Sequence, residues 1–131
     1  MSSSLLADKQ KIFVSDLDGT LLQGDGTLSE YSRAKLTELL SAGVHFTVAS
    51  ARAWGEITPI LGDLPLTLPV IAINGAYLTD YKTGKHHVIN NLANDFAQTI
   101  YSHILEHHLL PFIVTHNGVE DCLYWEELKN E

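Results

Sequence analysis

The sequence predicts an α/β fold built on an open parallel sheet, and three observations support this. Short apolar runs rich in β-branched residues occur at residues 11–15, 44–49 and 70–73. Segments with helical character separate these runs, so strands and helices alternate along the chain. Each run ends in polar residues, as expected where a buried strand leads into a loop. Alternation of this kind favours right-handed parallel strand-helix-strand units.

The first half of the chain can be assigned element by element. A glycine-rich segment at residues 19–26 follows the first expected strand and predicts a tight turn. Thr27, with a glutamate three residues later, fits a capping box, and the apolar spacing that follows predicts a helix over about residues 29–42. A weaker helix is expected over residues 54–61, interrupted by Pro59.

The pattern changes after the third strand. Antiparallel hairpins are expected over residues 77–89 and 112–125, the second around the turn Asn117-Gly118. The most regular helical periodicity of the chain lies between them and predicts a helix over about residues 93–108. Its apolar stripe consists of Ala93, Phe96, Ala97, Ile100, Ile104 and Leu105. Trp54, Phe96 and Trp125 are interpreted as packing residues.

Composition bounds the class of protein and its partners. Eight basic and 16 acidic residues give a net charge of −8, which opposes binding to nucleic acid and to anionic membranes. No segment approaches the roughly 18 apolar residues needed to span a bilayer, and the N-terminus lacks a secretory pattern. The single cysteine, Cys122, rules out an intramolecular disulfide and suits a reducing compartment. We therefore expect a cytoplasmic protein.

Polar side chains follow the ends of all three expected parallel strands. The carboxyl ends of such strands meet at one edge of an open sheet, where ligands bind. Asp16, Asp18, Ser50 and Asn74 are therefore expected to converge there. Asp16 and Asp18 lie two residues apart before Gly19, which lets the backbone turn sharply, so one carboxylate could attack a substrate while the other handles protons.

A metal ion follows from the same pair of carboxylates. Close acidic groups repel each other, so a bound divalent cation would keep Asp16 ionised and would neutralise an incoming phosphate. Oxygen ligands favour Mg²⁺. The sequence thus predicts a magnesium site beside Asp16 and Asp18.

Three segments resemble the haloacid dehalogenase (HAD) superfamily. FVSDLDGTLL at residues 13–22 is similar to its first signature, DxDGT after a hydrophobic strand. Ser50 closes the strand VHFTVAS, as the Ser or Thr of the second signature does. AINGA at residues 72–76 resembles the Cof-like subgroup with a type-IIB cap. The resemblance implies a Rossmann-like parallel core followed by the start of an α+β cap.

The resemblance also implies a magnesium-dependent phosphatase for small phosphomonoesters, such as a sugar phosphate or a phosphorylated cofactor. Asp16 would attack phosphorus to form an aspartyl phosphate, while Asp18 would protonate the leaving oxygen and then activate water. The Asp16 carboxylate and the Asp18 backbone carbonyl would be metal ligands, and the Ser50 hydroxyl would bind the transferring phosphoryl group. The further substrate or phosphate contacts would be Arg52, Asn74 and Gly19.

The chain also departs from the family. Ser50-Ala51-Arg52 stands where Thr-Gly-Arg is usual, a mild change that keeps the hydroxyl and the guanidinium. The third-signature lysine and the fourth-signature acidic cluster have no match. Residues 118–121 contain two acidic residues that could replace the cluster, but their position beside Asn117-Gly118 favours a hairpin with solvated acidic groups.

We therefore expect residues 10–77 to form the first part of the core domain and residues 78–131 an incomplete cap, within a fragment of a longer protein. The alternative to an active phosphatase is a truncated, non-catalytic fragment that binds phosphate or a partner. Unpaired sheet edges would favour its self-association.

One competing motif involves zinc. His103, Glu106 and His107 match H-x-x-E-H, a zinc-protease pattern with both histidines one turn apart on a helix. The neighbouring Ile104 and Leu105 belong to the apolar stripe, and no clear third ligand follows. We therefore interpret the motif as the exposed face of an amphipathic helix.

Overall fold

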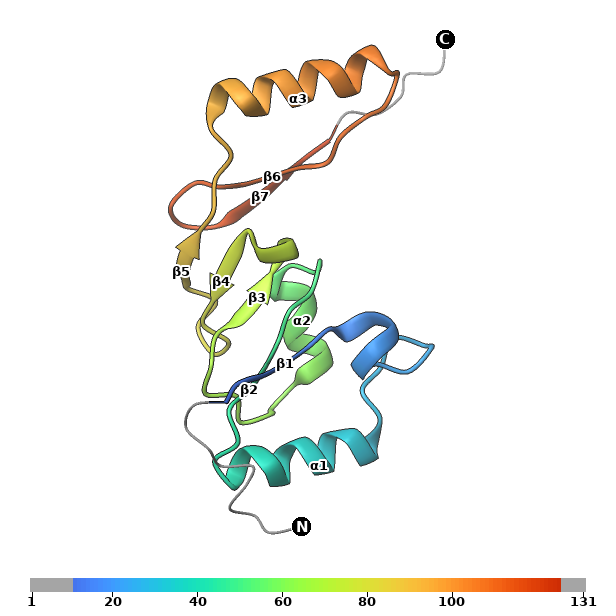
Figure 1. Ribbon diagram of the computed structural model, residues 1–131, viewed down its shortest axis with the longest axis vertical. Helices are drawn as coiled ribbons and strands as arrows, with labels where there is room; N and C mark the ends of the chain where they lie inside the picture. The colour runs from blue at the N-terminus through green and yellow to red at the C-terminus, as the bar shows by residue number, and fades with distance from the viewer. Residues whose placement is uncertain (1–10, 126–131) are drawn as a thin grey trace. The chain divides into compact units, whose positions relative to one another are not determined.

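The computed structural model describes residues 11–125, and the chain separates into two compact units, residues 1–90 and 91–131. The described part of the first unit carries two α-helices and five strands, and that of the second carries one helix and two strands (Figure 1). The predicted α/β class is confirmed. None of the helices between residues 11 and 125 is long and apolar enough to cross a membrane.

A parallel strand pair forms the start of the first unit. Strand β1, Phe13–Ser15, pairs in parallel with β2, Phe46–Val48, and helix α1, Glu30–Ser41, connects them. The Ala49 N–H donates to the Ser15 carbonyl at 2.9 Å, which extends the pairing to the residue after β2. The predicted strand-helix-strand unit is therefore present.

Helix α1 begins two residues later than the expected capping box. The Ser29 hydroxyl accepts the Ser32 N–H at 3.1 Å and caps the helix. The Thr27 N–H and hydroxyl instead bond to Asp25 Oδ1 at 3.0 and 2.7 Å. The predicted capping box at Thr27 is therefore wrong. The short Asp25 side chain forms a local turn by accepting hydrogen bonds from Thr27, two residues ahead.

Helix α2, Trp54–Leu61, runs through Pro59 without interruption, contrary to the expectation. Proline cannot supply the helical bond to the carbonyl four residues earlier. That carbonyl belongs to Gly55, which is exposed and open to water. The other end of the helix is satisfied by Arg33, whose Nη1 and Nη2 donate to Leu61 and Ile60 carbonyls at 2.6 and 2.8 Å.

The third strand leads into an antiparallel sheet. Strand β3, Val70–Ala72, adjoins β2 through one parallel bridge between Ala49 and Ile71. It then pairs antiparallel with β4, Tyr77–Thr79, which pairs with β5, His86–Ile89. The expected hairpin is present, and it continues the sheet from β3 within the first unit. The division into a core of residues 10–77 and a cap of residues 78–131 stays a prediction.

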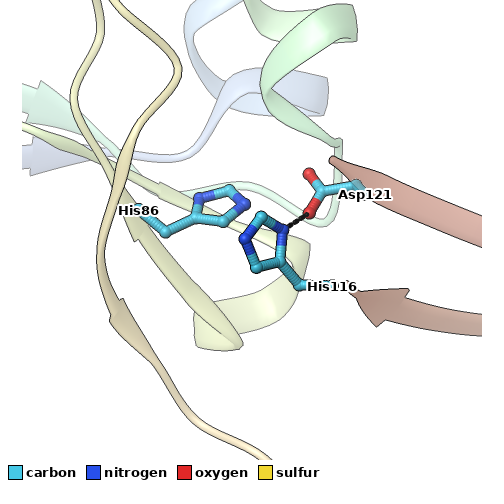
Figure 2. Close-up of side chains that lie close together, drawn as sticks. All are labelled: His86, His116 and Asp121. Carbon is cyan, nitrogen blue, oxygen red and sulfur yellow. Dashed lines mark hydrogen bonds and ion pairs between the residues drawn. The ribbon is translucent and has the colours of Figure 1, made fainter. Parts of the chain in front are cut away.

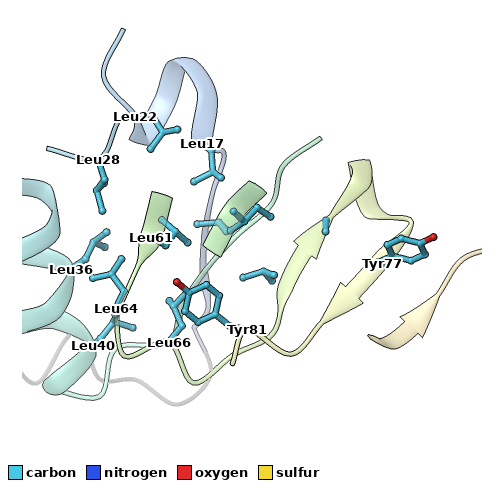
Figure 3. Close-up of a cluster of buried hydrophobic side chains, with 14 residues drawn as sticks. Leu17, Leu22, Leu28, Leu36, Leu40, Leu61, Leu64, Leu66, Tyr77 and Tyr81 are labelled. Atoms are coloured by element: carbon cyan, nitrogen blue, oxygen red, sulfur yellow. The ribbon is translucent and has the colours of Figure 1, made fainter. Parts of the chain in front are cut away.

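One hydrophobic core holds the first unit together (Figure 3). Leucines from the loops and helices pack there against side chains of β2, β3 and β4. Its buried members are Leu17, Leu22, Leu28, Leu36, Leu40, Val48, Ile57, Leu61, Leu64, Leu66, Val70, Ala72, Tyr77 and Tyr81. Trp54 packs against this cluster and donates its Nε1–H to the Tyr81 carbonyl at 3.0 Å, as its interpretation as a packing residue requires.

The second unit contains helix α3, Asn94–Glu106, and a hairpin of β6, Ile113–His116, with β7, Asp121–Tyr124. The predicted helix and hairpin are both present. Within residues 91–125, however, no side chain is buried. Phe96 and Trp125 are 56% and 59% exposed, so their interpretation as packing residues was wrong. The described residues of this unit offer too little apolar surface opposite them.

Candidate active site

The loop after β1 presents the two carboxylates. Asp16 directly follows β1 and is exposed, and its Oδ1 accepts the Leu17 N–H at 2.6 Å. Leu17 is fully buried and anchors the loop in the core. Gly19 has φ +74° and closes a wide turn in which the Leu22 N–H reaches the Leu17 carbonyl at 2.9 Å. Only glycine adopts this conformation without strain.

Ser50 stands at the end of the next strand. It is 6% exposed, and its N–H donates to the Ile71 carbonyl at 2.9 Å, so the backbone links β2 to β3. The Ser50 hydroxyl accepts the Arg52 N–H at 3.2 Å, which shapes the following loop. Burial and a fixed backbone therefore hold the hydroxyl in place.

The turn after β3 is tied to this serine loop. The Asn74 N–H donates to the Ser50 carbonyl at 3.0 Å, and the Ile73 N–H donates to the Arg52 carbonyl at 3.1 Å. Ile73, Asn74 and Gly75 have φ values of 49°, 52° and 89°. A β-branched residue with positive φ is strained and persists only where its surroundings hold it, as these bonds do here.

These three loops surround a hollow of about 290 Å³ at the carboxyl ends of β1, β2 and β3. Asp16, Ser50 and Asn74 contribute to its wall, together with Ala49, Ala51, Ile71 and Gly75. Three of the residues singled out from the sequence thus meet at one place. Asp18, Arg52 and Gly19 are not part of this wall.

Asp18 and Arg52 instead face each other beside the hollow. The Arg52 Nε–H donates to Asp18 Oδ2 and the Nη2–H to Asp18 Oδ1, both at 2.8 Å. The guanidinium lowers the pKa of the Asp18 carboxyl, chiefly through these side-chain hydrogen bonds, and the same bonds to Asp18 raise the pKa of Arg52. Both groups are partly exposed, so the pair contributes little to stability.

The oxygen atoms of Asp16 are suitable ligands for a hard cation such as Mg²⁺. This ion takes one or two carboxylates in proteins and keeps several waters or substrate oxygens. The exposed Asp16 carboxylate keeps Oδ2 outside its bond to Leu17, and the Asp18 carboxylate is engaged by Arg52. Asp16 Oδ2 is therefore the carboxylate oxygen suited to the ion, and the Asp18 backbone carbonyl stays a ligand that only the family resemblance implies.

The acidic residues of the β6–β7 hairpin do not form such a loop. The side chain of Asn117 accepts the N–H groups of Val119 and Glu120, both at 2.9 Å, which builds the turn. His116 Nδ1 lies 3.0 Å from Asp121 Oδ1 across the two strands (Figure 2). The hairpin interpretation of residues 118–121 is confirmed, but Asp121 is paired rather than simply solvated.

The H-x-x-E-H motif lies on the exposed side of α3. His103 packs edge-on against His107 at 4.6 Å between ring centroids, and its Nδ1 lies 3.6 Å from Glu106 Oε2. Within residues 11–125, these three residues do not form a group of ligand atoms close enough to hold a metal ion. The interpretation as an exposed helix face is confirmed.

Sequence reasoning missed the groups that hold this site in shape. The Asn90 Nδ2–H donates to the Gly75 carbonyl at 2.8 Å, and its backbone N–H donates to the Ala76 carbonyl at 2.8 Å. These bonds pin the turn after β3 from the end of β5. No local pattern in the sequence indicated this role for Asn90.

An α/β domain whose parallel strands end at a polar hollow has the Rossmann-like architecture that the sequence predicts. Residues 13–130 match the haloacid dehalogenase-like hydrolase family, and the chain belongs to that family. The resemblance to the N-terminal portion of its Cof-like members is thereby confirmed.

Curated relatives agree with this assignment. The chain is 37% identical over 71 residues to the pyridoxal phosphate phosphatase YbhA of Escherichia coli, covering 54% of this chain and 26% of the relative. It is 34% identical over 70 residues to the 5-amino-6-(5-phospho-D-ribitylamino)uracil phosphatase YwtE of Bacillus subtilis, covering 53% and 24%.

The fold is similar to that of a HAD phosphatase from Bacteroides thetaiotaomicron. The TM-score is 0.72 at 21% identity, and the match covers 91% of this chain and 42% of that structure. The chain spans less than half of the length of the curated relatives it matches.

Proposed function

We propose that this chain carries the nucleophile loop of a magnesium-dependent phosphatase that hydrolyses small phosphomonoesters through an aspartyl phosphate. The observation that supports this most directly is the hollow that gathers Asp16, Ser50 and Asn74. A nucleophilic carboxylate, a hydroxyl and an amide at the ends of parallel strands suit a phosphoryl group.

In the first step an Asp16 carboxylate oxygen attacks phosphorus, and the bond from phosphorus to the leaving oxygen breaks. Asp18, whose resting carboxylate is paired with Arg52, takes up a proton from the incoming phosphomonoester monoanion and gives it to that oxygen. In the second step Asp18 takes a proton from water, which attacks phosphorus, releases inorganic phosphate and restores the Asp16 carboxylate. Bound Mg²⁺ would neutralise charge between Asp16 and the phosphoryl group, held by the Asp16 carboxylate and the Asp18 carbonyl.

The remaining site groups bind and orient. The buried Ser50 hydroxyl is positioned to donate to a phosphoryl oxygen while it accepts the Arg52 N–H. Asn74, held by its backbone bond to Ser50, presents an amide to the same hollow. Gly19 serves the acidic loop through its φ of +74°, and because no atom lies within 4 Å of a Cβ built there, its contact with a phosphate stays a prediction from the sequence.

Small phosphorylated metabolites are the proposed substrate class. The two relatives are named for pyridoxal phosphate and for a phosphorylated ribitylaminouracil, which are a phosphorylated cofactor and a sugar-alcohol phosphate. The chain's own charge of −8 favours binding through a cation rather than through a basic surface. A cytoplasmic location stays a prediction.

The test is hydrolysis of 4-nitrophenyl phosphate by the 131-residue chain, with and without Mg²⁺. Asp16→Asn should lower turnover by at least about 10³-fold, because it removes the nucleophile. Its fold should persist, since Asp16 is exposed. Asp63→Asn, at a fully exposed carboxylate, is the matched control and should keep its activity. Full activity of Asp16→Asn would refute the assignment.

The alternative is a non-catalytic fragment that binds phosphate or a partner, and exposed apolar side chains on β1 and before it would favour self-association of such a fragment. Ile12, Phe13 and Val14 are 60%, 41% and 52% exposed. Light scattering across a range of concentrations tests it. Oligomers without magnesium-dependent turnover would support the alternative, whereas an active monomer would eliminate it.

A further inference from the structure

Arg52 and Asp18 form a charged pair beside the hollow, and its two hydrogen bonds join the loop after β2 to the loop after β1. The two residues are 34 positions apart, and the donors Nε–H and Nη2–H face the two carboxylate oxygens at equal distances of 2.8 Å. Two parallel bonds fix the plane and the orientation of a carboxylate, which a single bond does not.

The backbone of Arg52 is itself held on both sides. Its N–H donates to the Ser50 hydroxyl at 3.2 Å, and its carbonyl accepts the Ile73 N–H at 3.1 Å. The loop after β2 and the turn after β3 therefore place the Arg52 Cα, and the side chain extends from this fixed point to Asp18. The orientation of Asp18 thus depends on elements far from its own loop.

We propose that Arg52 is a positioning residue for Asp18, rather than the phosphate contact expected from the sequence. This inference rests on the proposed function, because it assigns to Asp18 the proton transfer to the leaving oxygen. Proton transfer requires a heavy-atom separation of about 2.6–3.2 Å, so an exposed carboxylate that rotates freely would spend much of its time misaligned. The guanidinium removes this freedom before a substrate arrives.

A merely structural role predicts something different. Side chains that are 32% and 54% exposed form a solvent-screened ion pair that adds little to folding stability. Removing Arg52 should therefore leave the midpoint of thermal unfolding almost unchanged. A lysine would keep the charge but not the two parallel donors. Arg52→Gln, which removes the charge, and Arg52→Lys, which keeps it, should therefore both lower turnover and both keep the fold.

The first arm of the test observes the pair directly, without turnover. The Arg52 Nε–H signal in ¹H–¹⁵N NMR spectra should exchange with water at least about tenfold more slowly in the wild-type chain than in Asp18→Ala. Asp16→Asn and Lys35→Gln, which alters an exposed pair on α1, should leave that signal unchanged. Equal exchange in the wild-type chain and Asp18→Ala would overturn the proposal.

The second arm uses the leaving group. A good leaving group such as 4-nitrophenolate departs with little help, whereas the alkoxide of glycerol 2-phosphate needs a proton from the acid. Arg52→Lys should lower kcat about tenfold or more for glycerol 2-phosphate and less than about threefold for 4-nitrophenyl phosphate. The KM for both should change little. An equal rise of KM for both substrates would show a phosphate contact and overturn the proposal.

The outcomes separate the two claims. Full turnover by Asp16→Asn contradicts the proposed function, whereas an unchanged leaving-group dependence in Arg52→Lys contradicts only the positioning role. If the chain shows no turnover, NMR spectra recorded during titration with inorganic phosphate and Mg²⁺ distinguish the positioning role of Arg52 from a phosphate contact. A shift of the Ser50 amide signal with an unmoved Arg52 Nε–H supports positioning, and transfer of Arg52 to phosphate overturns it.

Discussion

The two units of the chain differ in how they use their apolar residues. In residues 11–90, side chains from loops, helices and strands close a shared core around Leu17, Leu61 and Val70, each fully buried. In residues 91–125 no side chain is buried, although α3 carries the most regular apolar stripe of the sequence. Helical periodicity therefore predicts a helix without guaranteeing that the described chain supplies a surface to cover it.

The hydrogen bonds differ in the same way. In the first unit, Arg33 reaches the end of α2 and the Tyr81 hydroxyl donates to the Gly62 carbonyl at 2.6 Å. In the second, Thr99 bonds to Asp95 and His116 lies against Asp121, four and five positions apart. Long-range bonds and a closed core lead us to expect that the first unit is the more stable. The two tryptophans, Trp54 and Trp125, allow each unit to be followed separately.

The largest expected effect comes from truncation of a core leucine. Leu61→Ala should lower the free energy of unfolding of the first unit by about 2–5 kcal/mol, because it leaves a cavity. Leu123→Ala in β7, where the side chain is 52% exposed, should cost about 0.5 kcal/mol or less. Urea unfolding followed by Trp54 fluorescence in a Trp125→Phe background measures the first, and Trp125 fluorescence the second. Equal losses in the free energy of unfolding for the two variants would contradict the proposed difference between the units.

The next largest effect compares a Gly→Ala substitution in the first unit with one in the second unit. Gly84 and Gly118 have φ values of +74° and +94°. A Cβ at Gly84 would lie 3.0 Å from the Trp54 ring, whereas nothing lies within 4 Å of one at Gly118. Gly84→Ala should cost about 2–4 kcal/mol from strain and overpacking, and Gly118→Ala about 1–2 kcal/mol from strain alone. Thermal unfolding that ranks them in reverse would contradict this account.

The contact between α1 and α2 predicts a smaller effect. Arg33→Ala leaves two carbonyls at the end of α2 without their donors and should cost about 1–3 kcal/mol. Lys35→Ala removes an exposed, solvent-screened pair with Glu38 and should change the free energy of unfolding far less. Both are measured by urea unfolding. A loss as small for Arg33 as for Lys35 would mean that water replaces the guanidinium.

The smallest expected effect is a pH dependence in the first unit. The Thr83 hydroxyl and N–H, each bonded to Asp80 Oδ1, lower the pKa of the Asp80 carboxyl. A pKa lowered by folding contributes stability that is present above the unfolded pKa and is lost as the pH falls through the folded value, here below about pH 4. Asp80→Asn keeps an acceptor but removes the titration. Thermal unfolding between pH 3 and pH 6 should therefore be flatter for Asp80→Asn than for the wild-type chain.

Local patterns were sufficient for most of the elements and for the loops of the site. The apolar runs before Asp16 and Ser50, and the turn at Asn117-Gly118, each depend on neighbours within a few residues. The same short range explains the acidic loop, since Asp16 and Asp18 come directly after a strand. Periodicity and turn chemistry are properties of a short segment, so these features can be predicted from the sequence without knowledge of the tertiary structure.

Only the tertiary structure decided which groups meet. Arg52, which the family resemblance offers as a phosphate contact, pairs with Asp18 from 34 positions away. Asn74 enters the hollow on a turn with positive φ that is bonded to the Ser50 loop. Such contacts depend on how neighbouring strands are aligned and where their loops end, which no single segment encodes. The same reason explains α3: its stripe is a local property, but burial requires a partner surface, and the described residues provide none that covers it.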